Sequence, residues 1–133
     1  MKKLLIIPML FMCSMVIGQS KKIIGNPIKI ENLEVAQYDF PKEMNWYNAK
    51  AECAKLGKGW RLPTKDELNV MYKNKKKIDG FADGFYWSST EGKILSLETE
   101  GEFIDAWRKN FASGLRNSSS KDYPNYVRAV RAF

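Results

Sequence analysis

The chain has 133 residues, and its 22 lysines and arginines against 15 aspartates and glutamates give a formal charge of +7. It contains no histidine, which removes the commonest general base and the commonest metal-ligating side chain. With only two cysteines, it is not a disulfide-rich secreted domain either.

The first 18 residues have the pattern of a secretory signal peptide. A start with two lysines precedes the apolar residues 4–17, and Gly18 precedes a plausible cleavage site before Gln19. The apolar run is shorter than the roughly 20 residues that a membrane-spanning helix needs. A buried N-terminal helix is the alternative interpretation. We favour export to the periplasm, the cell surface or the medium, with no stable membrane insertion after cleavage.

The mature chain, residues 19–133, has the size of one domain. We divide it into a short polar lead at 19–27 and a single domain at 28–133. Loss of the two signal-peptide lysines takes the formal charge from +7 to +5. An exported basic domain more plausibly meets an anionic polysaccharide or envelope lipid than a nucleic acid.

Taken in chain order, the elements begin with an alternating apolar pattern over residues 28–36, which predicts a half-buried strand broken near Asn32. Asn45 is a suitable N-cap for a first helix. Its apolar face is predicted from spacings of three and four, and Gly57 is expected to end the helix. The apolar positions are Trp46, Ala49, Cys53 and Leu56.

A second helix is predicted to begin at Thr64, which forms a capping box with Glu67. Leu68, Met71 and Tyr72 supply its apolar face, and the helix is expected to end in the lysine run at 75–77.

The rest of the chain is predicted to be mostly strands. Aromatic and β-branched side chains at 85–90 favour a strand, and residues 93–105 are consistent with a hairpin that turns near Glu100. Residues 106–111 alternate again, Gly114 marks a turn, residues 117–125 are expected to be a serine-rich polar loop, and residues 126–133 a final strand. This order predicts an α+β domain with an antiparallel sheet.

Four segments together resemble a known set of exported bacterial domains: WYNAKAECAKLGKGWRLPTKDEL, FYWSST, AWRKNF and YVRAVR. They are similar to the Fibrobacter succinogenes major paralogous domain and the related C-terminal domain of Legionella collagen-like proteins. The resemblance covers roughly residues 28–133. It implies a C-type-lectin-like fold, in which two helices flank a small antiparallel sheet with long loops and the N- and C-terminal strands pair. It also implies a surface-exposed module, with some members tied to glycan binding and adhesion.

No catalytic site is expected, and no cofactor. Cys53 is the one candidate nucleophile after signal cleavage, but its place on the apolar face of a helix favours an inert packing role. Glu98, Glu100 and Glu102 would share one face of an extended strand. They would form a poor calcium cage, because calcium takes six to eight oxygens from several directions, so we favour a solvated acidic face and no metal.

The tryptophans have two possible roles, because they can stack on sugar rings or pack in a core. We favour packing for Trp46, Trp60 and Trp87 and are least decided for Trp107. Arginines on the late strands could grip sulfate or carboxylate, or could simply be scattered solubilising charge. The candidate ligand-binding residues are Trp107, Arg108, Asn110, Arg116, Asn117 and Lys121.

From these residues and the resemblance we expect an exported, non-enzymatic binding module for glycan, with an anionic glycan favoured by the charge. The expected site lies on the loops between 90 and 105 and between 114 and 125. The alternative is a protein-interaction or structural module of the cell envelope that binds no glycan.

Overall fold

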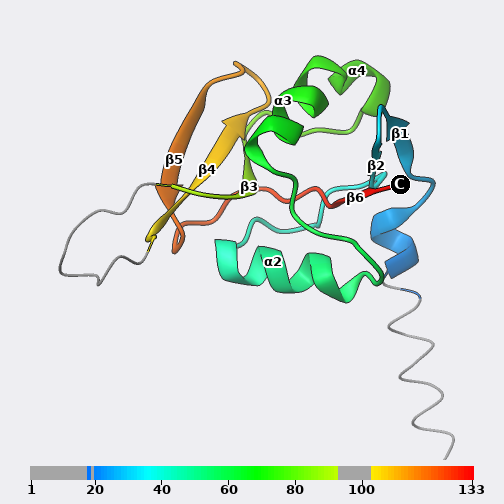
Figure 1. The fold of residues 1–133 in the computed structure, drawn as a ribbon, viewed down its shortest axis with the longest axis horizontal. Coiled ribbons are helices and arrows are strands. Elements are labelled where there is room, and N and C mark those ends of the chain that lie inside the picture. Colours follow the sequence, from blue (N-terminus) through cyan, green and yellow to red (C-terminus); the bar gives the residue numbers. More distant parts are fainter. Residues whose placement is uncertain (1–17, 19, 93–102) are drawn as a thin grey trace, which may run out of the picture.

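The computed structural model describes residues 18, 20–92 and 103–133, and within these it shows the expected mixture of helices and antiparallel strands (Figure 1). Residues 20–24 are helical. The elements that follow are, in chain order, β1 (Ile28–Ile30), β2 (Leu33–Val35), α2 (Trp46–Lys55), α3 (Lys65–Lys73), α4 (Lys75–Ile78), β3 (Phe85–Glu91), β4 (Asp105–Asn110), β5 (Arg116–Ser120) and β6 (Val130–Ala132).

The first sheet joins the two ends of the domain. Its strand order is β1-β2-β6, all antiparallel, with Val35 opposite Val130 in the β2–β6 pair. The predicted pairing of N- and C-terminal strands is therefore confirmed. The predicted break near Asn32 is also confirmed, since Glu31 has a φ of 54° in the turn between β1 and β2.

The second sheet, in the order β3-β4-β5, is antiparallel and carries the late part of the chain. The strands therefore divide between two small sheets. Two predictions are wrong here. The serine-rich residues expected to form a loop contain β5, and in the expected strand at 126–133 only Val130–Ala132 pairs as one. The hairpin expected at 93–105 lies mostly outside the described residues.

Both predicted helices are present, with the predicted caps. The Asn45 side chain accepts from the Asn48 amide, and Gly57 follows α2 with a φ of 117°. Thr64 and Glu67 form the capping box of α3. The second helix was expected to end in the lysine run at 75–77. It ends at Lys73 instead, and Lys75–Ile78 form the separate short helix α4 directly after Asn74.

Each helix covers its own apolar core. In Figure 1, α2 lies on the opposite side of the strands from α3 and α4. Beneath α2 pack Trp46, Cys53, Trp60 and Trp87, while beneath α3 pack Leu68, Met71, Tyr86 and Phe111. This confirms core packing for three tryptophans, and it leaves Trp107 as the half-buried one. No helix in the described part of the chain is long and apolar enough to cross a bilayer.

Candidate ligand-binding face

The central strand of the second sheet, β4, sends its side chains to two different environments. Its alternating pattern puts Trp107 and Lys109 on one face and Arg108 on the other. The face with Trp107 is on the side of α3, because the Lys65 ammonium of that helix lies over the Trp107 ring. The six predicted ligand-binding residues therefore do not form one cluster.

The first group is the Trp107 face, which we define as Lys65, Trp107 and Arg116. The Lys65 Nζ lies 4.9 Å from the centroid of the Trp107 ring, and the Arg116 guanidinium carbon lies 5.8 Å from it. Their backbones are held in place, because the Lys65 amide donates to Thr90 Oγ1 at 3.0 Å and Arg116 pairs with Lys109 in the sheet. The result is a half-buried indole with two cations within 6 Å of its ring centroid.

These two cations have no acidic partner in the described part of the chain. The ion pairs found there join Lys55 to Glu52, Arg61 to Glu67, Lys121 to Glu91, Arg128 to Asp39 and Arg131 to Glu34. The Trp107 face thus presents positive charge that these carboxylates do not neutralise.

The second group lies on the opposite face of the sheet and contains two predicted residues, Arg108 and Asn117. The Arg108 Nε donates to Asn117 Oδ1 at 2.9 Å, and its Nη1 donates to Asn125 Oδ1 at 3.1 Å. The guanidinium carbon lies 3.7 Å from the centroid of the Phe85 ring, and burial lowers the pKa of Arg108 from its usual value. Two of the five N–H donors of Arg108 are thus bonded within the protein.

The structure places Asn110 and Lys121 apart from both groups. The Asn110 side chain accepts from the amides of Ala112 and Ser113 and so shapes the turn before β5. Lys121 is 5 % exposed, and its Nζ donates to the Phe103 carbonyl at 2.6 Å and lies 4.2 Å from the Trp46 ring centroid. The Lys121 ammonium would have to break these contacts to bind a ligand, and the Asn110 Oδ1 atom is occupied by the turn.

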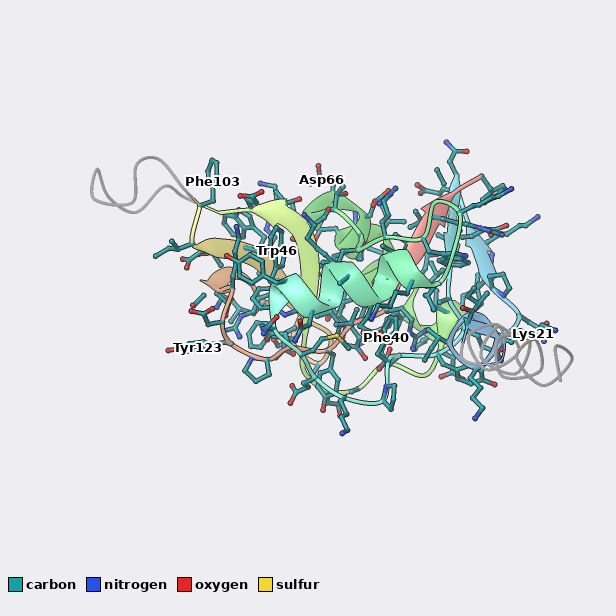
Figure 2. All side chains as sticks on the ribbon, turned by 90° about the horizontal axis from the view of Figure 1, so that it is seen from below. Lys21, Phe40, Trp46, Asp66, Phe103 and Tyr123 are labelled. Atoms are coloured by element: carbon teal, nitrogen blue, oxygen red, sulfur yellow. The ribbon has the colours of Figure 1, made fainter. Side chains whose placement is uncertain are left out.

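Around Lys121 the surface is aromatic. Tyr47, Phe103 and Tyr123 are all exposed, and we call these three residues the aromatic patch. The Tyr47 ring contacts the Lys121 ammonium, the Phe103 carbonyl accepts from it, and Tyr123 follows it by two residues. Figure 2 shows Phe103 and Tyr123 at the end of the molecule where α2 begins.

Cys53 is fully buried beneath α2, as its helical position predicted. Burial, together with the neighbouring charge of Glu52, raises the pKa of its thiol to about 12. A thiol in this state supplies almost no thiolate at neutral pH and is a poor nucleophile. Among the described residues, no group of three or more aspartates, glutamates or cysteines could hold a metal ion. The glutamates at 98, 100 and 102 lie outside them.

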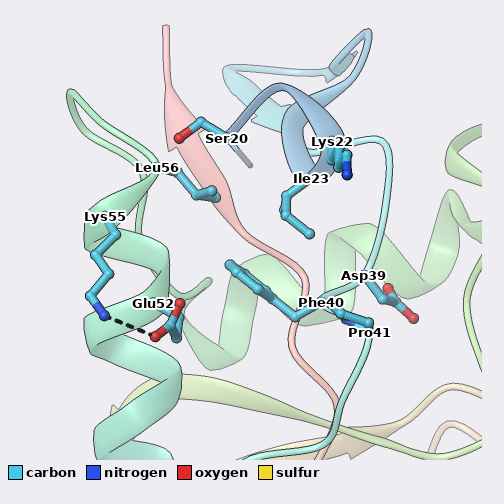
Figure 3. A pocket seen from close by; sticks show the side chains of 9 residues that line it. All are labelled: Ser20, Lys22, Ile23, Asp39, Phe40, Pro41, Glu52, Lys55 and Leu56. Atoms are coloured by element: carbon cyan, nitrogen blue, oxygen red, sulfur yellow. Dashed lines mark hydrogen bonds and ion pairs between the residues drawn. The ribbon is translucent and has the colours of Figure 1, made fainter. Parts of the chain in front are cut away.

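A groove of about 810 Å³ lies between the helical residues 20–24, the loop at Phe40 and the end of α2 (Figure 3). Its wall is made mainly by the apolar side chains of Ile23, Phe40 and Leu56. Its Lys55 and Glu52 neutralise each other at 3.0 Å. The groove therefore has no set of converging, uncompensated polar groups of the kind that fixes a polar ligand.

Four of the residues that define these surfaces were not predicted as site residues: Lys65, Tyr47, Phe103 and Tyr123. Lys65 follows the N-cap of α3, and only the packing of that helix against β4 brings it to Trp107. Tyr47 and Tyr123 are far apart in the sequence, and the backbone bond from the Trp46 amide to the Lys121 carbonyl brings their segments together. No periodic pattern marks such contacts, because they depend on how the helices cross the sheet.

Together, the pairing of the first and last strands, the two helices on opposite sides and the long connections define a C-type-lectin-like domain. Solved structures with this fold align over most of the chain. Botrocetin is 14 % identical, with a TM-score of 0.58, over 81 % of this chain and 96 % of its own. EMS16, an antagonist of the collagen receptor integrin alpha2beta1, is 13 % identical, with a TM-score of 0.58, over 82 % and 98 %. The snake venom toxin convulxin is 15 % identical, with a TM-score of 0.53, over 82 % and 95 %.

The chain belongs to the Lcl C-terminal domain family, whose model matches residues 25–131. This confirms the family resemblance drawn from the four sequence segments. A comparison with curated proteins found no match. At identities of 15 % or less the solved structures establish the fold alone, and they carry over no ligand or partner.

Proposed function

We propose that this protein is an exported, non-enzymatic binding module that recognises anionic glycan through the Trp107 face. The observation that carries the proposal is the half-buried Trp107 ring close to the Lys65 and Arg116 cations, neither of which has a carboxylate partner in the described part of the chain.

An anionic sugar needs two kinds of contact, and this face supplies both. The apolar C–H face of a pyranose ring packs well on an indole, which offers a large rigid surface with little entropy to lose. A sulfate or carboxylate accepts hydrogen bonds from a guanidinium in a bidentate geometry, and Arg116 is exposed enough to approach it. Lys65 adds a second positive charge, with its Nζ 4.9 Å from the centroid of the same ring.

The overall chemistry of the chain supports the same proposal. The net positive charge would draw polyanions toward the domain, and the signal-peptide pattern would bring it to the compartment where such polymers occur. Cys53 is buried with its thiol protonated, so it offers no route to covalent catalysis.

A binding titration tests the proposal. A sulfated polysaccharide and a uncharged polysaccharide of similar length are compared by calorimetry, at about 0.05 M and about 0.5 M salt, so that screening separates ionic from neutral contacts. We expect the sulfated polymer to bind and its affinity to fall steeply with salt. Arg116→Gln should weaken binding about tenfold, which is about 1.4 kcal/mol.

Lys58→Gln is the matched control, since Lys58 is exposed on the loop after α2 and removing it changes the net charge by the same amount. The proposal would be wrong if no anionic glycan bound, or if Lys58→Gln and Arg116→Gln weakened binding equally.

A second candidate function is recognition of a protein, and the aromatic patch favours it. Tyr47, Phe103 and Tyr123 are exposed aromatic side chains, a residue type enriched at the centres of protein interfaces. Botrocetin is described in a complex with the von Willebrand Factor A1 domain, so proteins with this fold do bind protein partners. Affinity capture with the wild type and with Tyr47→Ala/Tyr123→Ala distinguishes the two functions. A stoichiometric protein lost with this variant, but retained with Arg116→Gln, would favour protein recognition.

A further inference from the structure

A pocket of about 420 Å³ opens at the corner between α3 and α4, away from the Trp107 ring. Its lining consists of one aromatic residue, one amide and four cations: Tyr72, Lys73, Asn74, Lys75, Lys76 and Lys77. In Figure 1 this corner lies at the top of the molecule, where α3 passes into α4. We call it the lysine pocket.

Two ammonium groups are fixed against the Tyr72 ring, one on the wall of the pocket and one beside it. The Lys75 Nζ lies 4.8 Å from the ring centroid and donates to the Phe111 carbonyl at 3.0 Å. The Lys109 Nζ lies 4.9 Å from the same centroid and donates to the Gly114 carbonyl at 2.9 Å. These ammonium groups are therefore held in place before any ligand arrives.

The positive charge at this corner is not compensated. None of these lysines has a carboxylate within 4.0 Å in the described part of the chain, although Asp79 follows α4. Lys109 is only 8 % exposed. Burial first, and then the charges of Arg116 and Lys73, lower the pKa of Lys109. A bound anion would relieve this repulsion.

From these contacts we propose that the lysine pocket binds a phosphate monoester, with Lys73, Lys76 and Lys77 reaching the phosphate oxygens and Lys75 as the fixed cation. Lysine acts on phosphate as a mobile point charge, whereas a planar bidentate grip would call for arginine. A doubly charged group gains about twice the Coulomb energy of a singly charged sulfate ester from the same cations. The volume of about 420 Å³ has room for one phosphate head group.

The phosphate could belong to a soluble ester or to the head group of a lipid, and the two sources share this chemistry. The test on the purified protein uses phenyl phosphate, with phenyl sulfate as the singly charged isostere. Binding is followed by NMR shifts of the lysine side chains. A second arm measures sedimentation with phosphatidylcholine vesicles that contain phosphatidic acid, or phosphatidylglycerol as the diester control.

We expect phenyl phosphate to shift the pocket lysines and to bind at least several-fold more tightly than phenyl sulfate. Lys76→Gln/Lys77→Gln should weaken it about tenfold, whereas Lys42→Gln/Lys58→Gln, which removes two exposed lysines elsewhere, should not. Preference for phosphatidic acid vesicles without binding of the soluble ester would support the same site with a lipid source. Equal behaviour of phosphate and sulfate together with no preference between the two lipids, or equal losses in the two double variants, would overturn the proposal.

This site is independent of the glycan proposal. Arg116→Gln should weaken sulfated polysaccharide while Lys76→Gln/Lys77→Gln retains it. Each proposal can therefore fail without the other.

Discussion

The Arg128 guanidinium donates through Nε to Oδ1 of Asp39 at 2.6 Å, across 89 residues of sequence. Arg128 is 1 % exposed, and its terminal nitrogens also donate to the carbonyls of Ala36 and Asp79. Tyr86 donates its hydroxyl to the other oxygen of Asp39. One buried arginine thus ties the chain after β2, the end of α4 and the start of β3 into a single unit.

Replacing Arg128 with methionine should strongly destabilise the domain. The change leaves Asp39 charged without its partner and leaves buried carbonyls without a donor, a loss of about 3–5 kcal/mol. Urea unfolding followed by tryptophan fluorescence measures it. Lys55→Met is the control, because Lys55 and its partner Glu52 are both largely exposed and their ion pair should be worth much less. Similar losses in both variants would contradict the account.

Cys53 should resist thiol reagents in the native protein and react at once after unfolding. Its folded pKa of about 12 exceeds the ordinary value of 9.0, so folding favours the protonated thiol. The contribution of the protonated thiol to the free energy of unfolding is complete below about pH 9 and is lost as the pH rises toward 12. Between about pH 9 and pH 10 the wild type should therefore lose up to about 1 kcal/mol more stability than Cys53→Ala. Rapid native labelling at pH 7.5 would contradict the burial.

The capping box of α3 should make the stability of the domain depend on pH in the acid range. Partial burial alone would raise the pKa of Glu67, but its bonds to Arg61 and to the Thr64 amide lower it from its usual value. The stabilisation is present above about pH 4.3 and is lost as the pH falls through the lowered folded value. Glu67→Gln should thus be less stable than the wild type at pH 7 and nearly equal to it at about pH 2. Thr64→Ala should cost about 1 kcal/mol at pH 7. An E67Q difference that persists unchanged at low pH would exclude this explanation.

Gly114→Ala should destabilise the domain more than Gly59→Ala. The two glycines have nearly the same positive φ, 81° and 80°, so an alanine is strained by about 1–2 kcal/mol at each. At Gly114 the added methyl would also lie 3.0 Å from the Tyr72 ring, whereas at Gly59 its nearest neighbour would be Arg131 Cβ at 3.9 Å. The difference in urea midpoint between the two variants measures the packing of the β4–β5 turn against α3. Equal midpoints would mean that Tyr72 moves aside at no cost.

The local features of the fold were predictable from the sequence because they depend on neighbours a few residues away. The side chains of Asn45 and Thr64 cap the helices that follow them, and Gly57 ends α2, as predicted. The serine-rich β5 was missed because its residues lack an apolar alternation. β5 is a strand because its backbone pairs with β4, and its composition gives no sign of this pairing. A glycine-containing turn soon after a predicted strand was the available hairpin signal.

Charge was the weakest guide to burial. Lys109, Lys121 and Arg128 are buried, although lysine and arginine are mostly exposed in proteins. Each of them donates to a carbonyl oxygen, and Lys121 and Arg128 donate to carboxylates as well. The partners of Lys121 and Arg128 are distant in the sequence, whereas Lys109 donates to Gly114 across the β4–β5 turn. The candidate ligand residues on β4 divide between its two faces. The sequence predicted that Trp107 and Arg108 would lie on opposite faces, but it did not predict that α3 would cover only the face with Trp107.

Protection of single side chains from chemical modification, with and without saturating sulfated polysaccharide, tests the central claim most directly. Lysine acetylation reports on Lys65, and an arginine-specific dicarbonyl reports on Arg116, with the exposed Lys42 and Lys58 as internal references. The account predicts that the polymer slows modification of Lys65 and Arg116 several-fold and leaves both references unchanged. Unchanged reactivity at Lys65 and Arg116, or equal slowing at all four, would contradict a glycan site on the Trp107 face.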